Sequence, residues 1–535
     1  MSRGPQARLP GRLDLLVAVG LLVLAAAVRV PALGASSLWR DDAWQALAVR
    51  ATSPADLATY GLTSPGFAAL LAVVLRLPGR VEVLGPAVPF ALGCLLPPAL
   101  HLVARRLGAS TWGGAGAGVL LALSSAAAIY STRTKPYTLD ACLLLGVLLL
   151  AGLVLREPST RRWRALLGVV ALGALVSAQA LLAGGCAVLL CLLRPASRRA
   201  LGREWPLLAV PLVAAAVAYA SYVRRSTGNV LLREWWGREG GYTERTLTGL
   251  WAAWQRLLPG LLPAGREPVP PWHADPVTLE HVAGAALVVL TAAAVVGVLR
   301  GRGWLVALAL APALVALAGS LAERVPFGSR VDVPFYPGLL LVLALATRPS
   351  RRTPTTPRTA ASAVAAVVAL GGVLVLARGT ALEVAPSYPD HEFRPLVEAL
   401  QRDLLPDHRL LVDTYGTYPL AADGLFPFTV ERTTETMTGF AVVPDDPERV
   451  LISTEPGDPA LQLARLAQVV EQGSAVWLVE TDTGAKFDDE QYLRVGGTDR
   501  TRYAEVLRTG GAYELCRQQD WPAARLTLWQ PRGRC

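Results

Sequence analysis

The sequence alternates long apolar runs with short loops that are rich in arginine. Apolar runs begin near Leu13, Pro86 and Leu207, and runs of this kind approach the roughly 20 residues that a helix needs to cross a bilayer. Hydrophobic residues make up 53% of the 535 residues and charged residues 17%, which is too apolar for a soluble protein of this size. We therefore expect a polytopic α-helical membrane protein with about twelve crossings.

The arginine clusters indicate the orientation of these helices. Basic residues favour cytoplasmic loops, and pairs such as Arg105-Arg106 and Arg198-Arg199 recur in alternate loops. The formal charge of +10 therefore reports membrane topology and no nucleic-acid partner. With the N-terminus inside, we expect the loop after the first helix, a long loop over 224–280 and the C-terminal part to be extracytoplasmic.

The composition becomes polar from about Glu383 onward. Helix-like segments alternate there with strand-like segments, which predicts a small α/β sheet. The expected helices cover 393–404 and 459–471, and the expected strands cover 409–413, 475–480, 513–517 and 525–529. We expect a membrane domain over 1–380 and an extracytoplasmic α/β domain over 381–535. Cys516 and Cys535 lie in this second domain and could pair if it is extracytoplasmic, but Cys535 is terminal, so we do not expect a disulfide between them.

Two adjacent carboxylates, Asp41 and Asp42, follow the first apolar run. Adjacent like charges repel and are costly to remove from water, so the pair needs a reason to be there. One interpretation is a solvated helix start, where an aspartate oxygen accepts hydrogen bonds from free backbone N–H groups. The other is a catalytic base at the outer membrane surface, and the residue types alone leave both open.

Further charged residues lie in two later stretches on the predicted outer side. Arg133, Lys135 and Arg330 go against the topological bias, and Lys135 is one of only two lysines in the chain. An anionic lipid headgroup is one reason to keep cations at the bilayer surface. Tyr137 and Asp140 follow Lys135 closely.

Together these segments resemble the GT-C superfamily of lipid-linked-sugar glycosyltransferases, which includes the protein O-mannosyltransferases and the lipid A aminoarabinose transferase. The similar features are the acidic pair in the first outer loop, the stretch from Lys135 to Asp140, and Gly328-Ser329-Arg330 before a proline-containing helix start. The resemblance covers the membrane part as far as Ala346. The piece that opens at Thr63 lacks the histidine or acidic residues that many relatives have there.

The resemblance implies an inverting transfer of a sugar, hexosyl or pentosyl, from a polyprenyl phosphate to an extracytoplasmic glycan, lipid or protein. Asp41 would be the base, and Asp42 would orient the acceptor or a cation. The implied phosphate-binding residues are Arg133, Lys135 and Arg330, and the supporting residues are Asp140 and Tyr137. Asp140 would hold Lys135 or position the acceptor, and a purely structural ion pair is an equal alternative.

No cofactor is certain from the sequence. The three charged segments contain no histidine, which argues against a zinc site, whereas Asp41 and Asp42 offer the hard oxygen ligands that suit Mg or Mn. The competing class is a non-enzymatic transporter or assembly factor for lipid-linked cell-envelope intermediates. A transporter is expected to carry ionisable residues along the middle of its spanning helices, whereas here they lie at helix ends, which favours an enzyme. A ligase that joins a lipid-linked polymer to an acceptor would use nearly the same chemistry.

Overall fold

The computed structural model describes residues 11–35, 37–38, 40–50, 64–238, 241–257, 261, 276–347, 371, 373–374, 376–381, 392–412, 414–432, 440–452, 459–481, 503, 506–508, 511–521 and 524–535. The chain forms two compact units. The helical unit comprises Met1–Leu33, Pro86–Thr227 and Trp236–Ala385, and the sheet unit comprises Gly34–Gly85, Gly228–Trp235 and Pro386–Cys535. Residues 34–85, which contain the acidic pair, thus belong with the C-terminal sheet and not to one continuous domain over 1–380.

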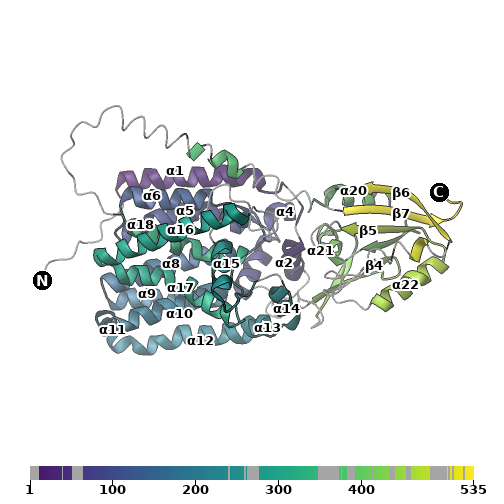
Figure 1. The fold of residues 1–535 in the computed structure, drawn as a ribbon. Coiled ribbons are helices and arrows are strands. Elements are labelled where there is room, and N and C mark those ends of the chain that lie inside the picture. The colour runs from purple at the N-terminus through teal and green to yellow at the C-terminus, as the bar shows by residue number, and fades with distance from the viewer. Residues whose placement is uncertain are drawn as a thin grey trace. The chain divides into compact units, whose positions relative to one another are not determined.

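The helical unit is built from a succession of apolar helices, drawn in Figure 1 from purple to green. Its main helices are α1 (Arg12–Arg29), α5 (Ala87–Arg106), α6 (Thr111–Leu123), α7 (Ser125–Ser131), α8 (Tyr137–Arg156), α9 (Thr160–Val176), α10 (Ala178–Leu193), α11 (Pro195–Leu201), α12 (Ala209–Ala218), α15 (Leu247–Leu257), α16 (Pro276–Gly297), α17 (Gly303–Leu321) and α18 (Tyr336–Leu345). The short turns and helices between them include η6 (Val298–Arg302), η7 (Ser329–Phe335) and α13 (Arg224–Gly228).

Five segments of the described residues are long and apolar enough to cross a membrane, or seven if two bent helix pairs each count as one span. The longest is Ala283–Leu321, with 39 residues. Gly301 interrupts it at a positive φ of 72°, so that α16 and α17 are separate helices on either side of Arg300 and Arg302, as the sequence predicts. The total of about twelve crossings stays a prediction; the last expected helix, near 360–376, lies largely outside the described residues.

The expected inner loops meet at one end of the helical unit. Arg302 Nη2 donates to Gly108 O (2.7 Å) and its Nη1 donates to Thr347 O (3.0 Å), while Arg156 Nη1 donates to Arg106 O (2.9 Å). These bonds join the ends of α5, α8 and α18 to the turn between α16 and α17. The arginine loops that the alternation assigns to one side are therefore neighbours.

The region expected to be a long loop over 224–280 contains helices in its described part. These are α13, α14 (Val230–Arg238), α15 and the start of α16. In α15, Ala253 and Leu257 are buried, and Trp254 Nε1 donates to Ala283 O of α16 at 3.1 Å. The expectation of a loop was wrong because Trp251 and Trp254, which the sequence suggests are interfacial residues, belong to the apolar face of α15 and pack against the core of the helical unit.

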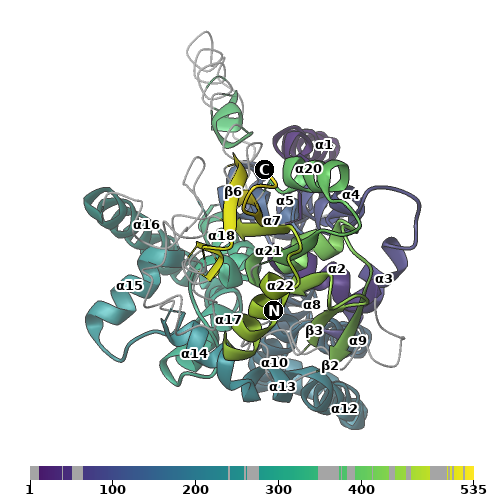
Figure 2. The ribbon, with the colours of Figure 1, turned by 90° about the vertical axis from the view of Figure 1, so that its right-hand side faces the viewer.

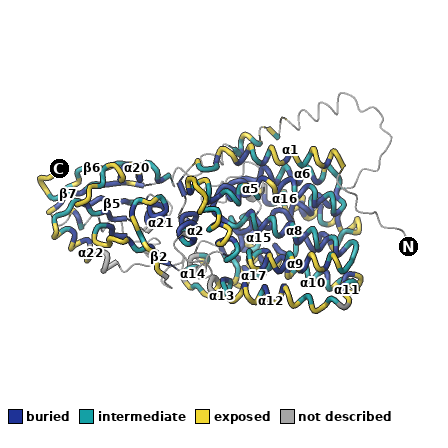
Figure 3. The backbone as a smooth tube through the Cα atoms, turned by 180° about the vertical axis from the view of Figure 1, so that it is seen from behind, coloured by how far each residue is buried: buried dark blue, intermediate teal, exposed yellow. Residues whose placement is uncertain are grey.

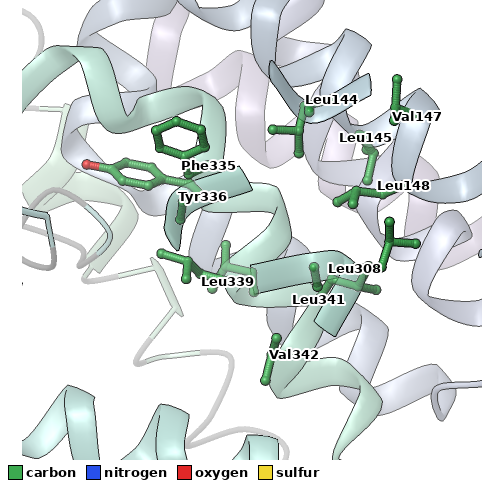
Figure 4. Packing of buried hydrophobic residues seen from close by; sticks show 14 of the residues in the cluster. Leu144, Leu145, Val147, Leu148, Leu308, Phe335, Tyr336, Leu339, Leu341 and Val342 are labelled. Carbon is green, nitrogen blue, oxygen red and sulfur yellow. The ribbon is translucent and has the colours of Figure 1, made fainter. Parts of the chain in front are cut away.

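Leucines of α8, α17 and α18 pack together in the core of the helical unit. Figure 4 shows Leu144, Leu145 and Leu148 of α8 together with Leu308 and Leu339. The apolar run 166–193 divides at Ser177, whose hydroxyl accepts a hydrogen bond from Ala180 N (2.9 Å) and so caps α10. The sequence placed this break a few residues later, near Gln179 or Gly184-Gly185.

The sheet unit has a five-stranded sheet in the order β4-β1-β5-β7-β6 and a separate hairpin of β2 and β3. The strands are β1 (Arg409–Val412), β2 (Phe428–Arg432), β3 (Phe440–Pro444), β4 (Val450–Ile452), β5 (Val476–Thr481), β6 (Tyr513–Asp520) and β7 (Ala524–Pro531). β1 pairs in parallel with β4 and β5, whereas β7 is antiparallel to β5 and β6. The four expected strands are confirmed as β1, β5, β6 and β7.

Helices cover both faces of this sheet. Along β1, Leu410 and Val412 face one core with α20 (Arg394–Asp403), whereas Leu411 faces another core with α22 (Pro459–Glu471). The central strand β5 is buried along nearly all its length (Figure 3). The sheet unit also contains α2 (Arg40–Arg50), α3 (Pro65–Val74), α4 (Val81–Leu84) and α21 (Thr414–Ala422).

Cys516 and Cys535 form a disulfide, which corrects the sequence expectation. Cys516 lies at a β-bulge between Leu515 and Arg517, and Arg532 N donates to Ala512 O at 2.9 Å, which turns the chain end back along β6. Their Cα atoms are 5.3 Å apart, within the usual range for a disulfide. The sequence separation of 19 residues gave no indication of this return.

Candidate active site

The acidic pair lies in the first turn of α2, where the sequence predicted a loop. Free N–H groups and the positive end of the helix dipole favour carboxylates there. Both side chains are nonetheless buried, Asp41 with 6% and Asp42 with 2% of its surface exposed. A solvated helix start would leave them in water. Because burying two adjacent carboxylates is costly, their position supports a functional site more than a surface cap.

The helix that carries the pair is packed into the core of the sheet unit. Ala43, Ala46 and Leu47 are buried with residues of α20, β1 and β5. The ring of Trp44 meets that of Tyr418 in α21 edge to face, with 5.6 Å between the ring centroids. α2 lies beside α21, as Figure 1 and Figure 2 show. The core of the sheet unit therefore fixes which way the first turn of α2 faces.

Arg133 and Lys135 lie in the connection between α7 and α8 of the helical unit. They are 4% and 7% exposed, so both cations are largely withdrawn from solvent. Lys135 N donates to Arg133 O at 2.8 Å, which tightens the connection. The ring of Tyr137 stands edge-on to that of Tyr130, with 5.3 Å between their centroids. The structure thus holds these basic side chains in a fixed turn.

Arg330 lies in η7, which packs against α7 and α8. The elements that carry the three candidate phosphate-binding residues therefore adjoin within the helical unit. The Arg330 guanidinium carbon is 6.0 Å from the ring centroid of Trp236, at the limit of a cation–π contact. Gly328 begins this turn at a φ of 111°, and a Cβ there would lie 2.7 Å from Arg256 Nε, so glycine is required.

Asp140 lies in the first turn of α8 and is buried. Its Oδ1 has no hydrogen-bond partner among the described residues, and the Ser177 hydroxyl acts on the same carboxylate. The position of Asp140 near the start of α8 agrees with the helix end that the sequence predicts. Its role in holding Lys135 or positioning the acceptor stays a prediction.

Asp332, Arg256 and Tyr336 form a buried polar group that was not predicted from the sequence. Asp332 has no exposed surface, and neither of its oxygens makes a hydrogen bond within the described part of the chain. Burial raises the pKa of Asp332 well above its usual range, although the Gly328 N–H and the Arg256 guanidinium act in the opposite direction. The Tyr336 hydroxyl points away from the leucines of the core (Figure 4). The signal for this group in the sequence is a single aspartate between two valines, Val331 and Val333.

The acidic pair belongs to the sheet unit and the candidate cations belong to the helical unit. The expectation that they meet in one site stays a prediction. Across the described residues, no group of three or more His, Cys, Asp and Glu side chains forms a metal site. Asp41 and Asp42 supply two carboxylates, and a Mg or Mn ion held there would need further oxygen ligands.

The apolar spans of the helical unit indicate a polytopic membrane protein, as the sequence predicts, and the fold of the chain is similar to that of two solved ArnT structures. The chain is similar to the crystal structure of ArnT from Cupriavidus metallidurans in the apo state, with 15% identity, a TM-score of 0.56 and coverage of 96% of this chain and 97% of that one. The same protein bound to undecaprenyl phosphate gives 15% identity, a TM-score of 0.55 and the same coverage.

A third similar structure is the arabinofuranosyltransferase AftD from Mycobacteria, with 17% identity and a TM-score of 0.43. The similarity covers 98% of this chain and 42% of the AftD chain. No protein-family model matches the chain, and no curated protein matches it. At these identities the likeness to ArnT establishes the fold.

Proposed function

We propose that the protein is a membrane glycosyltransferase that moves a sugar from a polyprenyl-phosphate donor to an extracytoplasmic acceptor. The observation that carries the proposal is the burial of Asp41 and Asp42 at the start of α2 in a chain with the ArnT fold. The ArnT structure with undecaprenyl phosphate supports a polyprenyl-phosphate partner. The sugar is a hexose or a pentose, and the acceptor is a glycan, a lipid or a protein.

The chemistry assigns Asp41 the role of general base. Asp41 takes the proton of the acceptor hydroxyl as that oxygen bonds to the anomeric carbon of the sugar, while the bond from this carbon to the donor phosphate breaks. Attack from the side opposite the phosphate inverts the anomeric centre. The departing phosphate gains negative charge, which fixed cations stabilise. We assign this role to Arg133, Lys135 and Arg330.

We assign Asp42 to orienting the acceptor or a cation, and Asp140 and Tyr137 to supporting the site. Asp140 lies in the first turn of α8, away from the middle of the helix, which supports an enzyme over a transporter or assembly factor. The disulfide between Cys516 and Cys535 supports an extracytoplasmic sheet unit, since disulfides persist in oxidising compartments. The arginine alternation supports the same orientation.

The test is turnover of polyprenyl-phosphate sugars by the purified protein, with a panel of hexosyl and pentosyl donors. Asp41→Asn keeps the shape of the side chain but removes the proton acceptor, so turnover should fall by about 10²–10⁴-fold. Asp42→Asn should cost less. If the pair binds a metal, both variants should lose similar activity, and added Mg or Mn should restore part of it. Wild-type turnover by folded, membrane-inserted Asp41→Asn would contradict the proposal.

A further inference from the structure

The segment that enters α2 is hydrogen-bonded to the segment that enters α20. Ser37, only 1% exposed, lies three residues before the start of α2. Its Oγ donates to Glu392 Oε1 (3.0 Å) and its N–H donates to Glu392 Oε2 (3.1 Å). Glu392 lies two residues before the start of α20. The segment that leads into the acidic pair is therefore held by both carboxylate oxygens of Glu392.

The same hydroxyl also caps α20. Phe393 N and Arg394 N each donate to Ser37 Oγ at 3.1 Å. The first N–H groups of a helix have no partner inside the helix, and Phe393, at the cap position, has no side-chain acceptor. Arg394 N also donates to Glu392 Oε1 at 3.2 Å, so α20 is capped both by the adjacent Glu392 and by Ser37, which lies 356 positions before Phe393 in the chain.

Arg394 closes this network. Its Nε donates to Glu392 Oε1 (2.7 Å) and its Nη2 donates to Glu392 Oε2 (2.8 Å), a paired geometry that is strong and directional. The Nη2 group also donates to Ala35 O (2.7 Å), in the segment before Ser37. Burial would raise the pKa of Glu392, but the hydrogen bonds from Arg394 and Ser37 lower it below its usual range. The carboxylate is therefore charged at neutral pH.

Apolar contacts extend this restraint along α2. Leu38 and Leu47 are buried in the same core as Leu396 and Leu400 of α20. A single body made of α2, α20 and the sheet therefore carries the acidic pair. A base must lie within hydrogen-bond reach of the proton it removes, so a small rotation of the first turn of α2 affects the reaction directly.

We propose that the C-terminal part of the sheet unit, Pro386–Cys535, positions Asp41 for catalysis. Ser37 is the positioning residue through which it does so. This inference rests on the proposed function, with Asp41 as the base. Ser37 acts on the orientation of the base and not on the donor. Its loss should therefore lower kcat and leave the donor KM unchanged.

The experiment compares kcat and donor KM for three variants of the full-length protein. Ser37→Ala should lower kcat by about ten- to a hundredfold, the range for a misplaced reacting group, with an unchanged donor KM. Ser37→Thr keeps the hydroxyl and should retain most of the activity. Ser159→Ala is the matched control, since Ser159 Oγ also caps a helix by accepting from Arg162 N, but in the helical unit. It should leave kcat unchanged.

A second measurement separates positioning from general loss of structure. In an Asp41→Asn background, Ser37→Ala should cause no further loss, because effects that act through one residue are not additive. A full additional loss there, or an unchanged kcat in Ser37→Ala alone, would overturn the inference. If Ser37→Ala does not fold, Glu392→Gln keeps the side-chain shape and should show the same loss confined to kcat; an unchanged kcat in that variant would also overturn it.

The two proposals fail in distinguishable ways. Wild-type turnover by Asp41→Asn would contradict the proposed function itself. A large loss in Asp41→Asn, together with an unaffected Ser37→Ala, would contradict only the positioning role.

Discussion

Arg29 Nε donates a hydrogen bond to Ser131 Oγ at 2.9 Å, joining the last turn of α1 to the last residue of α7. Arg29 Nη1 also donates to Ala122 O (3.0 Å), next to the 60° bend between α6 and α7. The guanidinium is buried and holds both sides of this bend. It thereby fixes the helix end from which the chain runs to Arg133 and Lys135.

Gly93→Ala tests this packing without removing any hydrogen-bonding group. A Cβ at Gly93 would lie 2.3 Å from Ser131 Cβ and 3.4 Å from Arg29 Nε, so Ser131 must move. We expect a loss of about 1–3 kcal/mol in the free energy of unfolding, the usual effect of overpacking, measured by thermal unfolding in detergent. Gly116→Ala in α6 is the control, since a Cβ there meets no atom within 4 Å. Equal melting temperatures for both variants would contradict the prediction.

The phosphate-binding prediction concerns Lys135 and Arg330. Replacing either with glutamine should raise the donor KM by about tenfold or more, because a hydrogen bond to a charged group contributes about 1.5–3 kcal/mol. The protein should remain folded. Arg324→Gln is the control, since Arg324 is exposed and lies in the same predicted outer segment as Arg330. An unchanged donor KM and kcat in both Lys135→Gln and Arg330→Gln would exclude a phosphate role.

The elements of the C-terminal domain were predictable because their apolar residues repeat locally. Along β1 and β5 the apolar residues form short continuous runs, and in α20 and α22 they recur at helical spacing; both patterns are visible in the sequence. In contrast, α21 and the short strand β4 gave no such pattern that we recognised. Thr414–Ala422 contains Pro419, and Val450–Ile452 has only three residues.

The place of the acidic pair in the fold was not predictable from local pattern. Leu38, Ala43 and Leu47 gave no sign of which distant apolar residues would cover them. They are covered by Phe393, Leu396 and other residues of the C-terminal core, some 350 positions later. The hydrogen bonds of Ser37 are equally distant in sequence. A long-range contact of this kind has no periodic signature in a single sequence.

Membrane orientation is tested by cysteine labelling in a background that lacks the four free cysteines. The arginine alternation predicts that Ala35→Cys and Asp445→Cys react with an impermeant reagent added outside intact cells, since both positions are exposed. Arg161→Cys, in a predicted inner loop and also exposed, should react only after permeabilisation. Labelling of positions 35 and 445 from opposite sides would contradict the predicted topology.

The final prediction concerns Asp332, whose pKa in the folded protein is raised by burial well above the ordinary value of 3.8. The folded state then keeps this proton at pH values where the unfolded chain has released it, so stability falls as the pH rises above about 4. Asp332→Asn removes this titration and keeps the shape of the side chain. We expect similar thermal unfolding midpoints for wild type and Asp332→Asn near pH 4, and a growing advantage for the variant toward about pH 8.

Asp520→Asn provides a control with the opposite sign. Asp520 lies on β6, is largely exposed, and hydrogen bonds from Arg525 and Gln518 lower its pKa. A lowered pKa stabilises the folded state above the ordinary pKa, so Asp520→Asn should give no gain at high pH and a small loss at most. Asp332→Asn, in contrast, should become more stable than the wild type only as the pH rises, because the folded wild type then has to ionise a buried carboxyl group. Parallel pH profiles for wild type and Asp332→Asn would show that Asp332 is not held protonated in the folded state.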